Sequence, residues 1–551
     1  MRNPSISARA MVLASTALLL SGGLAMAAPR AAAKSQPPLT LGIEFGSPGF
    51  TENFNPFSPT HLLGDSYMYE PLYMVNMLNG KQSPWLATSY QWVTSTELQF
   101  TIRKGVKWSN GTPLTPADVV YTFDLLHRYP ALDLNGVWTD MKSVSAKGDV
   151  VTFKFSKPNI PDWYFIATTY IVNKAQWSHI ANPTKFTNPS PVVTGPYVLA
   201  HFSAESYTLK ANPLYWQKAR VHVPAITSMA LTSNTTADLQ LAEGKFDQAA
   251  LFTPNIQKVY ARVNPKFYHY WYPQGVPVNL FMNLTKYPFN QLKFRQAVAY
   301  AISRPNISKN GEYGYMLPAN QSQLPPTMQA QWLDKSLQAK YPYRYDPAKA
   351  AQLLRSMGLK KNAQGQLLGP GGKQLTISIE VPTGWTDYIQ DCQIIASSLG
   401  KLGIKVQVET PSVSTWTNDT ETGHFDMALN RLTTYPNPYL IYDQLLSSQN
   451  SAPVGQVAST NWERWRNPKT NQLLLKYQET SSPKAQKAVV NQLQQILYRQ
   501  LPVVSLVWGT SFNEYQTNHY VGWPTAKQGY ALPPYYFPDT LSIILHLRPR
   551  P

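Results

Sequence analysis

Residues 98–126 read LQFTIRKGVKWSNGTPLTPADVVYTFDLL, and their pattern decides the fold class. Apolar and polar residues alternate over the first eleven positions, as in a β-strand with one buried face, and the Asn-Gly pair after them favours a turn. A helix should follow, because Thr115 is a good N-cap, Pro116 suits the first helical position and Asp118 completes a capping box. A strand followed directly by a capped helix predicts α/β layering.

The alternation of strands and helices continues along the chain. Further strands are predicted at residues 40–45, 150–155, 375–381, 404–408 and 502–508. Further helices are predicted at residues 290–303, 346–358, 385–401 and 484–500. Cys392 lies on the apolar stripe of the third of these helices, so we expect an inert thiol in the core. The predicted fold class is α/β.

Composition excludes several classes of protein. Of 551 residues, 43% are hydrophobic and 14% charged, and glycine and proline are too few for a low-complexity chain. No internal apolar run approaches the ~20 residues of a membrane-spanning helix. A single cysteine excludes an intramolecular disulfide. The net charge of +18 comes from scattered Lys and Arg, so we expect a solvated basic surface and no nucleic-acid partner.

The first 27 residues have the features of a cleaved secretory signal peptide. Arg2 and Arg9 supply the positive region, MVLASTALLL follows, and Ala25-Met26-Ala27 fits the small-x-small pattern before cleavage. Gly23 stands where a lipoprotein signal would carry cysteine, so we expect no lipid anchor. Because an unanchored exported protein stays near the cell only behind an outer membrane, the sequence predicts a periplasmic protein that starts at Ala28.

The sequence offers few groups for catalysis or metal binding. Its nine histidines are scattered, and no two of them are four residues apart. The nucleophile elbow and the glycine-rich nucleotide motifs are also missing from the sequence. We therefore expect no catalytic residue, no metal site and no cofactor. Paired carboxylates are brought together only by the fold, so a secreted hydrolase remains the rival hypothesis.

Aromatic residues stand close to the ends of several predicted strands. Trp385, Tyr435 and Trp508 follow or end such strands, and Trp271 and Tyr272 precede another apolar segment. Open α/β sheets bind ligands at the carboxyl edge of their strands, so these side chains are candidate ligand contacts. For each one, a position in the core or at its rim is the alternative.

Four blocks of sequence occur together in one known family. They are PWLA (84–87) with FTIRKGVKWSNGTPLTPADV (100–119), TGPY (194–197) with NPLYW (212–216), FRQAVAYAI (294–302), and LP (501–502) with VGW (521–523). In combination they resemble the family 5 extracellular solute-binding proteins, the peptide and nickel group of ABC-importer binding proteins. The resemblance implies a two-lobe periplasmic binding protein, type II-like, and no enzyme. Its implied partners are a peptide or oligosaccharide ligand and inner-membrane ABC permease subunits, and the protein itself would be a monomer.

The resemblance also implies a domain order. Domain I, the first lobe, would combine residues 34–62, 191–278 and 503–551, domain II would be an extra domain at 63–190, and domain III, the second lobe, would be 279–502. The chain would cross between lobes near Val278 and Pro502, and two short crossings suit a hinge because few torsions must change. Trp138 is placed as a ligand contact from domain II by position alone.

One strand-end motif departs from the family pattern. Peptide-binding members carry G-W-x-A-D-Y, whose acid meets the α-ammonium of the peptide, whereas this chain reads NRLTTYPNP over residues 430–438. Thr434 takes the position of the acid, and Arg431 adds a positive charge nearby. A short peptide is the nominal ligand, if another acid such as Glu44 or Glu52 replaces the missing one, and an oligosaccharide stacked on aromatic rings is the alternative. The expected ligand contacts are Trp138, Trp271, Tyr272, Trp385, Asn430, Arg431, Thr434, Tyr435, Asn437 and Trp508.

Overall fold

The stretch at residues 98–126 folds as a strand, a turn and a capped helix. β5 (Glu97–Ile102) is shorter than the predicted strand, because the backbone turns at Gly105 with a φ of +82°. The chain then enters α2 (Pro116–Arg128), where Thr115 donates its backbone N–H to the Asp118 carboxylate at 2.8 Å. The predicted capping box is confirmed, and α2 packs against the neighbouring strands β6 (Met141–Lys147) and β7 (Val150–Phe155).

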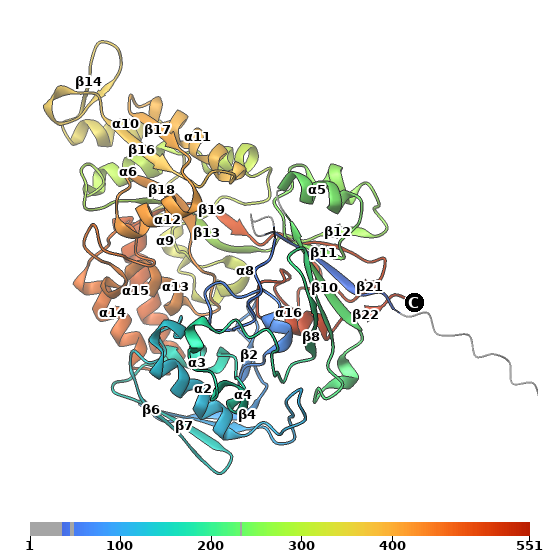
Figure 1. Cartoon of the computed structure of the whole chain (residues 1–551). Coiled ribbons are helices and arrows are strands. Elements are labelled where there is room, and N and C mark those ends of the chain that lie inside the picture. Colours follow the sequence, from blue (N-terminus) through green and yellow to red (C-terminus); the bar gives the residue numbers. More distant parts are fainter. Residues whose placement is uncertain (1–35, 45–48, 232–233) are drawn as a thin grey trace, which may run out of the picture. The chain divides into compact units, whose positions relative to one another are not determined.

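A computed structural model describes residues 36–44, 49–231 and 234–551, of which 37–551 form one unit. The predicted signal peptide and its cleavage site lie outside the described residues. Three larger sheets dominate the described chain (Figure 1). Three small two-stranded sheets accompany them: β2 (Tyr73–Val75) with β3 (Gln82–Pro84), β14 (Lys360–Lys361) with β15 (Leu367–Leu368), and β21 (Tyr520–Val521) with β22 (Arg548–Pro549).

The seven-stranded sheet defines what we call the first lobe. Its strands, in spatial order, are β12 (Tyr268–Tyr270), β20 (Glu514–Gln516), β11 (Gln248–Ala249), β1 (Leu39–Glu44), β10 (Ala225–Leu231), β9 (Ser206–Ala211) and β8 (Tyr197–Phe202). β1 runs parallel to β10 and β11, and the outer strands pair antiparallel. α5 (Asn234–Ala242) packs on β1 and β10, and α16 (Thr540–Ile544) lies near the C-terminus of the chain.

The four-stranded sheet defines the extra domain. It is antiparallel in the order β4 (Ala87–Thr94), β5, β7 (Val150–Phe155) and β6 (Met141–Lys147). Its helices are α1 (Asp65–Met68), α2, α3 (Trp163–Thr168) and α4 (Lys174–Trp177). Phe123 of α2 meets Phe153 of β7 edge-on, with ring centroids 4.8 Å apart, so the helix closes the core over the sheet.

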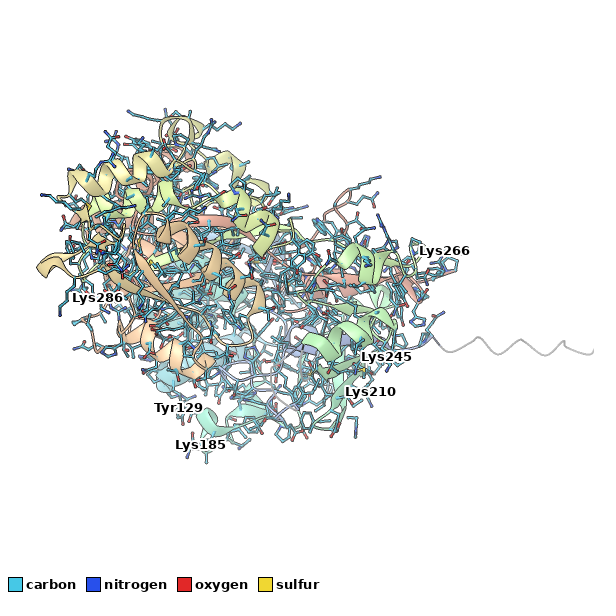
Figure 2. All side chains as sticks on the ribbon, turned by 90° about the horizontal axis from the view of Figure 1, so that it is seen from above. Tyr129, Lys185, Lys210, Lys245, Lys266 and Lys286 are labelled. Atoms are coloured by element: carbon cyan, nitrogen blue, oxygen red, sulfur yellow. The ribbon has the colours of Figure 1, made fainter. Side chains whose placement is uncertain are left out.

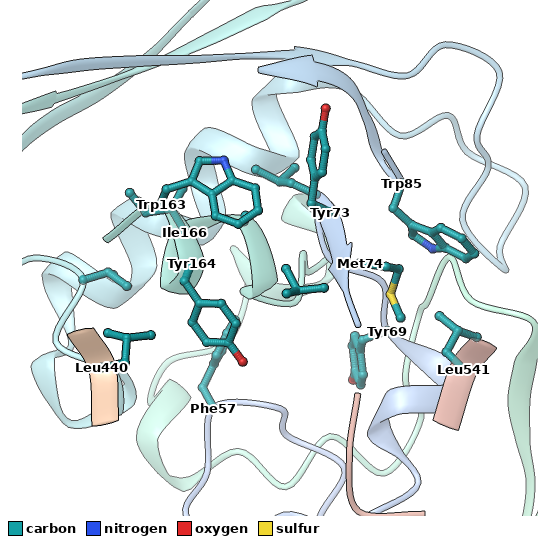
Figure 3. Packing of buried hydrophobic residues seen from close by; sticks show 14 of the residues in the cluster. Phe57, Tyr69, Tyr73, Met74, Trp85, Trp163, Tyr164, Ile166, Leu440 and Leu541 are labelled. Atoms are coloured by element: carbon teal, nitrogen blue, oxygen red, sulfur yellow. The ribbon is translucent and has the colours of Figure 1, made fainter. Parts of the chain in front are cut away.

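One hydrophobic core runs from the extra domain into both lobes. Tyr73 and Trp163 of the extra domain share a cluster of buried residues with Leu440 of α13 (Pro438–Leu446) and Leu541 of α16 (Figure 3). The rings of Tyr73 and Trp163 are 5.8 Å apart at 70°. This continuity fixes the extra domain against the elements around it.

The five-stranded sheet defines the second lobe. Its order is β17 (Lys405–Glu409), β16 (Thr376–Glu380), β18 (Met427–Arg431), β13 (Gln274–Met282) and β19 (Val504–Thr510). Its helices are α6 (Leu292–Ala301), α7 (Arg304–Asn306), α8 (Pro326–Gln329), α9 (Lys335–Lys340), α10 (Pro347–Ser356), α11 (Thr386–Gly400), α12 (Val413–Thr422), α13, α14 (Pro468–Gln478) and α15 (Pro483–Gln500). Cys392 is fully buried on α11, as its helical stripe predicted.

The chain passes between the two larger sheets at positions that differ from those expected. It leaves the first-lobe sheet after β12, crosses at residues 271–273 and enters β13, and it returns at residues 511–513 between β19 and β20. Val278 therefore lies inside β13, and Pro502 lies before β19. Pro277, within β13, sits at a bulge in the pairing of β13 with β19, where a proline is tolerated.

The basic side chains are distributed over separate elements. Lys185, Lys210, Lys245 and Lys266 are all exposed, and Lys185 lies far from Lys266 in Figure 2. Among the described residues, no helix is both long and apolar enough to cross a bilayer.

Candidate functional site

The carboxyl edge of β16 and β18 brings two of the predicted site residues together. The two strands are parallel, with Glu380 opposite Ala428, so their ends point the same way. Arg431 is the last residue of β18, and Trp385 follows β16 as the N-cap residue of α11. Trp385 packs edge-on against Trp416 of α12, with ring centroids 5.4 Å apart. This edge is where open α/β sheets place ligands.

Arg431 connects the second lobe to the C-terminal segment of the first. Its guanidinium donates to the backbone carbonyl of Thr510 at 2.8 Å, and it also interacts with the side chain of Tyr536. Burial by itself would lower the pKa of Arg431, but Tyr536, Tyr388 and Asp387 outweigh it and the pKa is raised. The Arg431 guanidinium therefore stays charged, and the groups that stabilise its charge belong to the protein itself.

Asp387 and Glu312 interact with Arg431, and Asp391 interacts with both of these acids. Sequence motifs gave no sign of these three carboxyl groups. Burial raises the pKa of Asp387, in the first turn of α11, while backbone N–H groups and Arg431 oppose the shift. Glu312 and Asp391 are fully buried, and their carboxyl oxygens have no partner other than each other among the described residues.

Glu312 and Asp391 interact with each other, and burial followed by neighbouring charge raises the pKa of both. Two acids in one buried site cannot both ionise, so the pair retains a proton. Gly311 makes their approach possible, because a Cβ there would lie 1.8 Å from Asp391 Oδ1.

Tyr272 lies in an aromatic cluster at the crossing between lobes. Its ring meets those of Phe512 and Tyr315 edge-on, each with centroids 5.2 Å apart, and its hydroxyl donates to the buried Glu514 of β20. Trp271 pairs with the other crossing by donating its backbone N–H to Asn513 at 3.0 Å. These contacts join the two crossing segments.

The segment after β18 leads from Arg431 to the extra domain. Asn430 is opposite Asn279 in the β13 pairing, and Thr434 Oγ1 lies 3.3 Å from where a Cβ on Gly275 would be. The ring of Tyr435 meets Tyr164 and Phe165 of α3 edge-on, at 5.6 and 5.9 Å. The side-chain oxygen of Asn437 caps α13 by accepting the N–H of Tyr439 at 2.8 Å.

Two residues expected to contact the ligand, Trp138 and Trp508, pack within the protein. Trp138 stacks on His127 at 4.0 Å and donates its indole N–H to the carbonyl of Phe123, so it packs on α2. Trp508 is buried within β19 opposite Pro277. Of the two alternative acids, Glu52 lines a separate hollow beside β8, and the side chain of Glu44 lies outside the described part of the chain.

The sequence and the fold are both similar to those of known proteins. The profile described as "Bacterial extracellular solute-binding proteins, family 5 Middle" matches residues 81–453, more than half of the chain. The chain belongs to family 5. Its match to the "Nickel-binding periplasmic protein" of Escherichia coli (strain K12) is 27% identical over 410 residues and covers 70% of this chain and 73% of the relative.

Solved structures of family 5 relatives share the fold. An oligopeptide ABC transporter periplasmic oligopeptide-binding protein from Thermotoga maritima superposes with a TM-score of 0.86 at 28% identity, covering 93% of this chain and 99% of the other. A mannohexaose-bound structure of the Thermotoga maritima protein has a TM-score of 0.81 at 28% identity, covering 93% and 98%. The two-lobe family 5 fold predicted from sequence is thereby confirmed. These relatives are binding proteins, and the described residues contain no group of three or more His, Cys, Asp or Glu arranged to hold a metal.

Proposed function

We propose that this substrate-binding protein of an ABC importer captures a neutral oligosaccharide between its lobes. The observation that carries this proposal is the charge balance at the carboxyl edge of β18. Asp387 faces Arg431, and Glu312 with Asp391 is buried and holds a proton, so none of these three acids is left for an ammonium group. A full charge brought into such a site without a partner typically costs about 3–5 kcal/mol.

The aromatic surroundings of this edge favour a sugar for a second reason. Trp385 is partly exposed beside Trp416, and flat apolar rings bury area without needing a countercharge. The mannohexaose-bound relative, at 28% identity over almost the whole chain, makes manno-oligosaccharides the first ligands to test.

A short peptide is the second candidate. Asp387 is only partly buried, and a rotation away from Arg431 would present its carboxylate to an ammonium group. The relative from Thermotoga maritima that is described as an oligopeptide-binding protein is consistent with this alternative.

Calorimetry with manno-oligosaccharides, a free tripeptide and its N-acetylated form distinguishes the candidates. We expect oligosaccharide binding, and less than about a fivefold difference between the two peptides, because Thr434 supplies one hydrogen bond worth about 1 kcal/mol at most and no charge. Free peptide binding at least tenfold tighter than the acetylated form, with no sugar binding, would favour the peptide. Recovery of a chemically altered ligand would instead favour the hydrolase.

The location of the protein is part of the proposal. We infer export to the periplasm, release of the mature chain at Ala28 and delivery of the ligand to inner-membrane permease subunits by a monomer. N-terminal sequencing of periplasmic protein should begin at Ala28 or within a few residues of it. A mature form that retains Met1, or that carries lipid, would contradict the cleavage site.

A further inference from the structure

A cavity of about 280 Å³ lies between the extra domain and the second lobe. One wall comes from β3, β4 and the start of α3, and the other from Trp332, residues 436–438 and the ends of α14 and α15. Its volume is close to the lower end of the about 300–1,000 Å³ typical of small-molecule pockets. The cavity is thus large enough for a small ring-shaped group.

The lining of this cavity is aromatic and uncharged. Tyr90, Trp92, Trp163 and Trp332 line it, and none of the described lining residues is acidic or basic. Tyr90 and Trp163 stand 4.9 Å apart at 42°, and both Trp92 and Trp332 keep part of their surface exposed. A charged ligand would find no countercharge here, whereas an uncharged ring can pack on these faces.

Several polar groups in the lining lack a partner. Tyr90 donates its hydroxyl to Gln82 Oε1 at 2.9 Å, which leaves the Gln82 NH₂ group to donate. Asn437 Oδ1 is used by Tyr439 and Tyr477, and its NH₂ group has no hydrogen bond to a described residue. The indole N–H of Trp163, in a side chain only 7% exposed, has no partner either.

Unpaired donors beside aromatic rings match the hydroxyl groups and apolar faces of a sugar. A purely apolar occupant would leave the buried donor unsatisfied, which is unfavourable. We propose that this cavity is a second sugar-binding subsite, which holds a neutral pyranose unit of the oligosaccharide captured at the β18 edge. The inference rests on the proposed function and assigns to it a site beyond the cleft.

The two sites are close to each other along the backbone. Residues 432–437 run from Arg431 at the β18 edge to the wall of the cavity, and six residues span at most about 20 Å. The contact of Tyr435 with Tyr164 lies on this path, because Tyr164 also lines the cavity. Since the two walls belong to the extra domain and the second lobe, an occupant would also hold these parts together.

The test is a calorimetric series of manno-oligosaccharides of two to six units with the full-length mature protein. Trp332→Ala removes one aromatic face, and Asn437→Asp keeps the capping oxygen of α13 while it removes the donor. Tyr345→Ala is the matched control, because Tyr345 is 44% exposed in the second lobe and does not line the cavity. We expect each cavity variant to weaken binding of the six-unit ligand at least threefold. The shortest ligand that binds should change less than twofold.

Each outcome of this series either supports or overturns the second subsite. A loss below threefold for the six-unit ligand, or an equal loss for the shortest ligand, overturns the second subsite and leaves the proposed function standing. If the wild-type protein binds no oligosaccharide of the series, both the subsite and the oligosaccharide function fall. A similar loss in Tyr345→Ala would show that the effect is not specific to the cavity and would likewise overturn the subsite.

Discussion

Glu514→Gln should be more stable than the wild-type protein by about 3 kcal/mol at pH 8.5, and less stable by about 1 kcal/mol at pH 5. Glu514 is fully buried at the crossing between lobes, where it accepts the N–H of Leu251 at 3.0 Å and the hydroxyl of Tyr272. Burial raises its pKa to about 8, although these hydrogen bonds work in the opposite direction.

The direction of the effect follows from proton binding. The carboxyl group has an ordinary pKa of 4.5, which we take for the unfolded chain, and releases its proton near pH 8 in the folded protein. Between these values the folded state binds more protons, so a rise in pH lowers the free energy of unfolding by about 1.4 kcal/mol per pH unit. Glutamine does not titrate, so the free energy of unfolding of the variant does not fall in this way as the pH rises. At pH 5 the variant only has a poorer match of donors and acceptors.

Urea unfolding at pH 5, 7 and 8.5 measures the effect as a difference between variant and wild type. Other buried acids contribute equally to both proteins and cancel. Glu205→Gln, which changes an exposed carboxyl group of the first lobe, is the control for the exchange of glutamate for glutamine itself. A difference for Glu514→Gln that stays constant with pH would contradict the raised pKa.

Local signals in the sequence predicted the helices well. The cap at Thr115 and the cap of α10 at Asp346 involve residues no more than three positions apart, so both partners of each interaction lie within one short stretch of sequence. The aromatic residue after β16 and the arginine at the end of β18 could also be anticipated, because parallel strands bring their carboxyl ends to one edge.

Contacts between residues that are far apart in the sequence could not be predicted from such local signals. Glu312 and Asp391 are 79 positions apart, Tyr272 and Glu514 are 242 apart, and no motif marks any of them. Tyr272 was expected at the ligand because it precedes a strand, and it lies in the segment through which the chain crosses between the sheets. Its aromatic ring is used to join the lobes, which is a role that only the pairing of the strands makes visible.

Arg431→Met should lower the free energy of unfolding by about 2–3 kcal/mol, because it removes a hydrogen bond that a charged group donates to the carbonyl of Thr510, 2.8 Å long in the wild type. It also removes the positive charge near Asp387. Because Asp387 keeps part of its surface in water, the loss of this charge contributes the smaller share. Urea unfolding at pH 7 measures the change.

A second substitution separates the charge from the hydrogen bond. In Arg431→Met with Asp387→Asn, the uncompensated carboxylate is removed, so up to about 1 kcal/mol of the lost stability should return. The hydrogen bond to Thr510 is missing in both variants and cannot account for such a recovery. If the double variant is as unstable as Arg431→Met alone, then Arg431 does not neutralise Asp387. In that case Asp387 would be available to an ammonium group, and the argument for a neutral ligand at the β18 edge would fail with it.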